Sequence, residues 1–147
     1  MKRSTTSCFP DINVWMALAV ERHQFHRAAA RWWDSDESEA IGFCRFTQMG
    51  LLRLLTSAAA MTGRPLTNER AWRVYEGFLQ DIRVAVFPEP ASVEDRFKTH
   101  AAVPQPAPKL WADGYLAAHA AASNATLVTF DRAFEKYSVK TLVLETE

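Results

Sequence analysis

Short apolar runs alternate with longer helical patterns along the whole chain. The longer stretches repeat apolar residues at helical spacing, whereas the short runs are bounded by prolines, polar clusters or acids. The pattern predicts strands at residues 6–10, 40–44, 84–87, 125–130 and 141–144, and helices at residues 13–20, 23–33, 46–55, 67–79, 92–101, 109–123 and 131–137. This alternation of strands and helices predicts an α/β fold with a parallel sheet.

Turn and loop signals separate these elements. The polar cluster at residues 34–39 predicts a loop, and Gly63-Arg64-Pro65 predicts a turn. Ser92, followed three residues later by Asp95, resembles a capping box at the start of a helix. The three prolines within residues 104–108 exclude a helix interior and predict a rigid loop. This loop is too short for a domain linker, so we expect one domain over residues 1–147.

Composition excludes several classes of protein. Of the 147 residues, 48% are hydrophobic and 23% are charged, which argues against global disorder. The formal net charge is zero, so bulk positive charge cannot hold nucleic acid, although a local basic patch remains possible. No apolar run reaches the roughly 18 residues of a membrane span, and no apolar segment of a signal peptide follows Lys2 and Arg3. We therefore expect a cytoplasmic protein without membrane association.

Cysteines and aromatic residues indicate packing. Cys8 and Cys44 each lie in a short apolar run without metal-ligand spacing, which favours buried free thiols. Five tryptophans and nine phenylalanines are many for this length. They predict a well-filled core, and some of them could form a surface that binds a partner or a second copy.

Three aspartates are the candidates for chemistry. Asp11 and Asp131 follow predicted strands directly, and ligands of parallel sheets bind outside the carboxyl ends of the strands. Asp113 lies in an apolar helical stretch, where an unpaired buried carboxylate is costly. Carboxylates gathered in this way hold Mg²⁺ or Mn²⁺ for phosphoryl chemistry. Asp11 and Asp131 could alternatively serve only as helix N-caps.

Four stretches of the chain resemble a known family. They occur in the order and spacing of the PIN-domain ribonucleases, and within them of the VapC-type toxins of type II toxin–antitoxin pairs. Each stretch alone is weak, but together they cover nearly the whole chain. The matching segments are Asp11-Ile12-Asn13-Val14-Trp15 and residues 47–56, 111–118 and 127–134.

The resemblance implies a PIN-like three-layer α/β/α domain that hydrolyses RNA phosphodiesters with Mg²⁺ or Mn²⁺. It implies that Asp11, Asp113 and Asp131 are the catalytic acids and metal ligands. Gln48 stands where the family usually has a fourth acid, a glutamate, so the number of bound ions is open. Asn13 and Thr129 could orient the carboxylates by hydrogen bonds. The expected partners are RNA, a VapB-type antitoxin and a second copy of the chain.

Two other readings compete with a nuclease. A phosphatase of the haloacid-dehalogenase type needs a second aspartate two residues after the first, but this chain has Asn13 there. That residue argues strongly against the phosphatase. The other alternative is a catalytically weak or inactive PIN-like domain that binds RNA or a protein without cleavage. Gln48 is its main support, because an amide brings no negative charge to a metal.

Overall fold

Five parallel strands form a single sheet within residues 6–146, which the computed structural model describes. Their order across the sheet is β3-β2-β1-β4-β5, so β1 is central. The predicted parallel sheet is confirmed. The strands are β1 (Ser7–Pro10), β2 (Ala40–Phe43), β3 (Val84–Val86), β4 (Thr126–Thr129) and β5 (Thr141–Val143).

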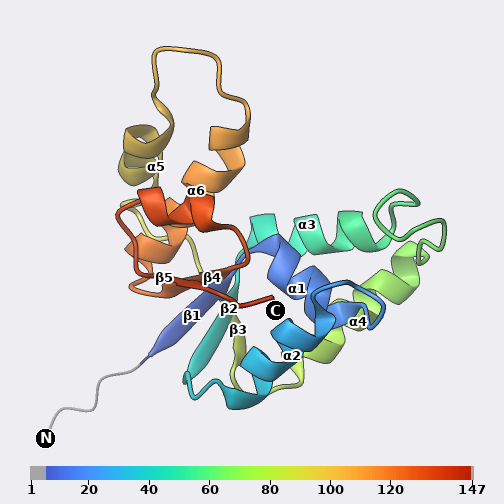
Figure 1. The fold of residues 1–147 in the computed structure, drawn as a ribbon. Helices are drawn as coiled ribbons and strands as arrows, with labels where there is room; N and C mark the ends of the chain where they lie inside the picture. Colours follow the sequence, from blue (N-terminus) through green and yellow to red (C-terminus); the bar gives the residue numbers. More distant parts are fainter. Residues whose placement is uncertain (1–5, 147) are drawn as a thin grey trace, which may run out of the picture.

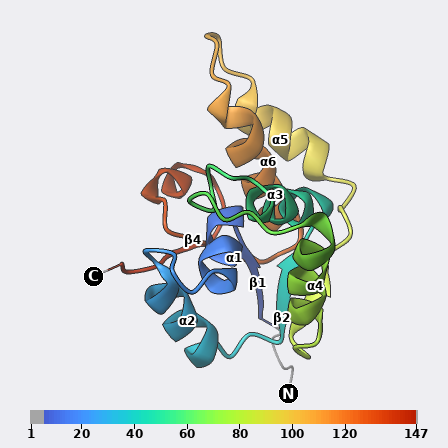
Figure 2. The ribbon, with the colours of Figure 1, turned by 90° about the vertical axis from the view of Figure 1, so that its right-hand side faces the viewer.

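Helices cover both faces of this sheet, which confirms the three-layer α/β/α architecture (Figure 1). One face carries α1 (Ile12–Ala19), α2 (His26–Ser35), α3 (Arg45–Leu55) and α4 (Asn68–Leu79). The other face carries α6 (Lys109–Ala122), with α5 (Val93–Ala101) packed against it, and the 3₁₀ helix η1 (Arg132–Lys136). The side view in Figure 2 shows α5 and α6 as a projecting pair joined by the proline-rich loop.

Successive side chains of the strands point alternately into two hydrophobic cores, one on each face of the sheet. Cys8 and Val128 face the core under α1 to α4, whereas Phe9 and Leu127 face the core under α6. Successive side chains of a strand point to opposite faces, so a strand buried on both faces is apolar throughout. Cys8 and Cys44 are buried free thiols, as predicted.

The predicted element boundaries shift by a few residues. The second helix begins at His26 instead of residue 23, because residues 21–25 form turns in which the Phe25 N–H donates to His23 Nδ1 at 3.0 Å. The other elements agree with the prediction to within one residue at either end, and the last predicted helix is the 3₁₀ helix η1.

The predicted capping box at Ser92 is wrong. The Ser92 side chain makes no capping hydrogen bond at the start of α5. A capping box does exist at α3, where the Cys44 N–H donates to Thr47 Oγ1 at 2.9 Å. The cysteine at the cap position hides this motif, because capping-box patterns are built on Ser or Thr.

Gly114 allows α5 and α6 to approach closely. A Cβ at this position would lie 3.2 Å from His100 Cβ, so the helices meet where a side chain is missing. Within residues 6–146, no helix is long and apolar enough to cross a membrane.

Candidate functional site

Sheet topology brings Asp11 and Asp131 to the same edge. Strands β1 and β4 are parallel neighbours, with Pro10 opposite Val128. Asp11 follows Pro10 directly, and its N–H donates to the Val128 carbonyl at 2.9 Å. Asp131 follows the end of β4 by two residues. Both acids thus stand outside the carboxyl ends of adjacent strands, where parallel sheets bind ligands.

Asp11 is a buried carboxylate held by two hydrogen bonds. Its side chain is 5% exposed. Oδ1 accepts the Val14 N–H at 3.0 Å and caps α1, while Oδ2 accepts the Thr129 hydroxyl. Burial raises the pKa of Asp11 from 3.8 to about 6, and the charge of Asp131 acts in the same direction. The N-cap role is therefore real, but it leaves a buried acid whose ionisation is penalised.

Thr129 connects the two acids at this edge. It is fully buried, its hydroxyl donates to Asp11, and its Oγ1 accepts the Asp131 N–H at 3.0 Å. The exposed Asp131 side chain accepts the Ala133 N–H at 2.9 Å and caps η1. Thr129 thus orients one carboxylate and the backbone of the other. Asn13 is exposed, and only its backbone N–H supports Asp11.

Asp113 approaches the same edge from α6. Its side chain is half-buried, and its pKa is raised by burial and then by the charge of Asp131, while Lys109 and Lys136 act in the opposite direction. Asp131 is therefore close enough to both other aspartates to disfavour their ionised forms.

The three aspartates do not form a compact set of metal ligands in this structure. Within residues 6–146, no group of three or more His, Cys, Asp or Glu side chains lies close enough together to hold a metal ion. None of the three forms an ion pair with a lysine or arginine in this part of the chain. The donor chemistry nevertheless fits a hard divalent cation, because Mg²⁺ prefers oxygen ligands and needs only one or two carboxylates beside its waters. Their assignment as metal ligands stays a prediction.

The resemblance grouped Gln48 with the three aspartates, but in the structure Gln48 makes its hydrogen bond elsewhere. Its buried Oε1 accepts a hydrogen bond from Arg45 Nη1 at 2.5 Å. No hydrogen bond joins Gln48 to any of the three aspartates in the described chain. The sequence reasoning missed the pair with Arg45, although the spacing of three residues on one helix permits it.

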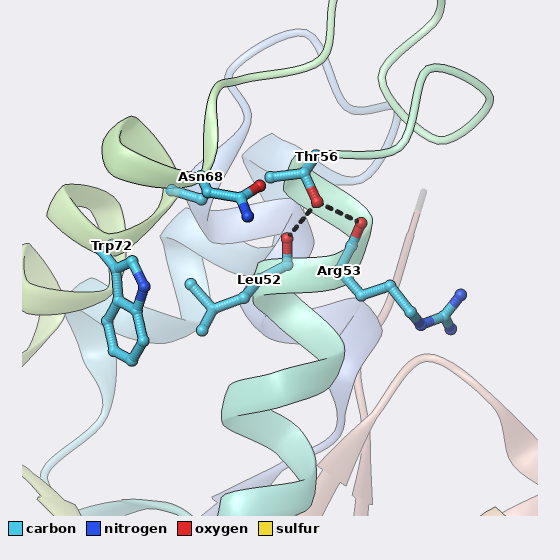
Figure 3. A pocket seen from close by; sticks show the side chains of 6 residues that line it. Leu52, Arg53, Thr56, Asn68 and Trp72 are labelled. Carbon is cyan, nitrogen blue, oxygen red and sulfur yellow. Dashed lines mark hydrogen bonds between the residues drawn. The ribbon is translucent and has the colours of Figure 1, made fainter.

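Two hollows flank α3. The first, which we call the α3–α4 hollow, measures about 210 Å³ and is drawn in Figure 3. At its edge, the Thr56 hydroxyl donates to the Leu52 and Arg53 carbonyls. The second, the α3–α6 hollow, measures about 560 Å³. Neither is lined by an acid: the first is formed by Leu52, Arg53, Thr56, Asn68, Ala71 and Trp72, and the second by Arg45, Phe46, Met49, Phe97, Pro108, Trp111, Ala112 and Tyr115.

Known proteins share both the sequence and the fold. The PIN domain family matches residues 8–140. Ribonuclease VapC41 of Mycobacterium tuberculosis is 44% identical over 132 residues, which cover 86% of this chain and 90% of that protein. Among solved structures, the fold resembles M. tuberculosis VapC20, a sarcin–ricin loop cleaving toxin (TM-score 0.63, 17% identity, 87% of this chain and 92% of that one). It also resembles a chain of the DNA-bound VapBC complex from Salmonella typhimurium (TM-score 0.63, 18% identity, 95% and 98% coverage).

The matched range contains all three aspartates together with Gln48 and Thr129. The five-stranded parallel sheet and its two helical layers agree with the solved relatives. This chain belongs to the PIN domain family, and within that family to the VapC group of ribonucleases.

Proposed function

We propose that this protein is the endoribonuclease toxin of a toxin–antitoxin pair and acts on RNA in the cytoplasm. The observation that carries the proposal is the buried Asp11 carboxylate, which Thr129 holds beside Asp131 without a cationic partner. The identity to ribonuclease VapC41 supports RNA as the substrate.

Each acid has a distinct proposed role. Asp11 and Asp113 would hold one Mg²⁺ or Mn²⁺ ion, because both offer carboxylate oxygens and neither has a lysine or arginine ion-pair partner in residues 6–146. Asp131, which is exposed and already caps η1, holds a water of the ion or a second ion. A bound divalent cation supplies charge neutralisation for the phosphodiester and lowers the pKa of a bound water. Thr129 keeps the Asp11 carboxylate in a fixed orientation.

Cleavage of RNA tests this function. We expect the wild-type protein to cleave single-stranded RNA in Mg²⁺, and EDTA to abolish the reaction. Asp11→Ala and Asp113→Ala should remove cleavage, whereas Glu37→Gln, in an exposed loop, should retain it. Equal cleavage by the two alanine variants would refute the assignment. Absence of Mg²⁺ and Mn²⁺ binding at millimolar concentrations would favour the inactive, RNA-binding or protein-binding alternative.

An antitoxin is the proposed protein partner, and the α3–α4 hollow is its proposed contact surface. The solved relatives include VapBC complexes. Trp72 is 47% exposed beside this hollow and gives a partner an aromatic anchor. Trp72→Ala should therefore weaken the toxin–antitoxin complex, as measured by calorimetry, while metal-dependent cleavage by the free toxin stays unchanged.

A homodimer is proposed through Met49 and Trp111, the exposed apolar side chains of the α3–α6 hollow, with Arg45 of that hollow left outside the contact. Met49 and Trp111 on its walls are 58% and 62% exposed, which is unusual for large apolar side chains that gather on one face. Trp111→Glu should shift the protein from dimer to monomer in light scattering. A wild-type monomer at all concentrations would contradict this part of the proposal.

A further inference from the structure

Gln48 and Arg45 form a polar pair at the start of α3. Gln48 is only 5% exposed, and its Oε1 lies 2.5 Å from Arg45 Nη1. The Arg45 side chain extends to the surface. A buried amide therefore fixes the orientation of an exposed guanidinium, because a buried carbonyl oxygen would be costly without this donor.

The pair leaves the positive charge of Arg45 available. Within residues 6–146, Arg45 forms no ion pair with a carboxylate, whereas Arg83 pairs with Asp81 at 2.9 Å and Arg73 pairs with Glu69 at 3.5 Å. Gln48 orients Arg45 but cannot neutralise it, since an amide carries no charge. A glutamate at position 48 would form a salt bridge with Arg45 and cancel that charge.

Strand order places Arg45 at the edge that carries the acids. Strands β1 and β2 are parallel neighbours, with Cys8 opposite Ile41. Asp11 follows the end of β1, and Arg45 follows the end of β2 by two residues. The same edge thus presents carboxylates after β1 and β4 and a cation after β2.

We propose that Arg45 binds a phosphate of the RNA substrate beside the cleaved bond, and that Gln48 is its positioning residue. This inference rests on the proposed ribonuclease function. A guanidinium offers parallel N–H donors that match two phosphate oxygens. Contacts to phosphates fix the register of nucleic acids on proteins. Arg45 therefore holds the RNA so that a neighbouring phosphodiester lies at the acids. Because the residue at position 48 is neutral, the positive charge of Arg45 is not cancelled.

Equilibrium binding of a short single-stranded RNA in EDTA tests the proposal without requiring cleavage. Arg45→Ala should weaken binding about tenfold at low salt. The slope of log affinity against log salt concentration should become less steep by about one, which is the contribution of one phosphate contact. Gln48→Glu should weaken binding in the same direction by neutralising Arg45. Arg73→Ala is the matched control, because Arg73 is exposed and already paired, and it should change the affinity less than about twofold.

Kinetics and metal titration separate this role from that of the acids. In Mg²⁺, Arg45→Ala should raise KM more than it lowers kcat and leave the calorimetric affinity for Mg²⁺ unchanged. Unchanged RNA affinity and salt slope in Arg45→Ala would overturn the inference while the ribonuclease function stood. No RNA binding by the wild type would also overturn it. If Arg45→Ala lost affinity for the antitoxin but kept its RNA affinity, Arg45 would be a contact for the protein partner instead. If Gln48→Glu bound Mg²⁺ more tightly, position 48 would belong to the metal site.

Discussion

Asp11→Asn should make the metal-free protein more stable at neutral pH. The pKa of Asp11 is raised by burial to about 6 in the folded protein, from 3.8 in its ordinary state. The folded state therefore binds this proton more tightly than the unfolded state. Stability falls as pH rises from about 4 through 6, and the full loss persists above pH 6.

The magnitude follows from the two pKa values. At about 1.4 kcal/mol for each pH unit, the ionised Asp11 costs roughly 3 kcal/mol above pH 6. Asparagine keeps the acceptor for the Val14 N–H and is an equally good N-cap. It presents an N–H₂ to Thr129 where the wild type has a carboxylate oxygen, which offsets part of the gain. We expect a net gain of about 1–3 kcal/mol, with about 2–4 °C of Tm for each kcal/mol.

Thermal denaturation in EDTA measures this effect. At pH 7.5, Asp11→Asn should melt above the wild type, and this advantage should disappear towards about pH 3, where the carboxyl is protonated in both the folded and the unfolded state. Glu37→Gln, in an exposed loop, should differ from the wild type by less than about 0.5 kcal/mol. A variant less stable than the wild type at pH 7.5, or a difference independent of pH, would refute the reasoning.

Three further predictions concern one residue beside Asp11 and two residues of α6. Thr129→Val should destabilise the protein by about 1–3 kcal/mol in urea denaturation, because Asp11 loses a buried donor, whereas Thr129→Ser should stay close to the wild type. Burial lowers the pKa of His119 below 6.5, so stability should fall as pH drops below 6.5, and His119→Leu should flatten that part of the pH profile. Gly114→Ala should change the free energy of unfolding by less than about 1 kcal/mol in thermal melts, because crowding of the new methyl against His100 Cβ at 3.2 Å offsets the roughly 1 kcal/mol that alanine gains over glycine inside a helix; a rise in Tm by that full gain would count against tight packing of α5 on α6.

Much of the fold is readable from local sequence. Parallel strands buried on both faces appear as short apolar runs, and each of the five predicted strands agrees with the structure to within one residue at either end. The two acids after β1 and β4 follow from the same logic, because strand ends fix their positions. Asp113 could be placed only by resemblance, since a helix carries no signal that says which face meets the sheet edge.

Contacts between distant side chains lay beyond sequence reasoning. The bond from Thr129 to Asp11 joins residues 118 positions apart. Whether Gln48 contacts the acids or Arg45 is decided only by packing, and the structure shows the hydrogen bond with Arg45. The capping box at Cys44 was missed because a thiol replaces the usual hydroxyl.

Calorimetric titration with Mn²⁺ tests the central claim most directly. The account predicts that the wild-type protein binds Mn²⁺, that Asp11→Asn and Asp113→Asn each weaken this binding at least about tenfold, and that Glu37→Gln does not change it. Binding of equal strength by the wild type and both aspartate variants, or no binding by the wild type at millimolar Mn²⁺, would contradict the assignment of these acids as the metal site.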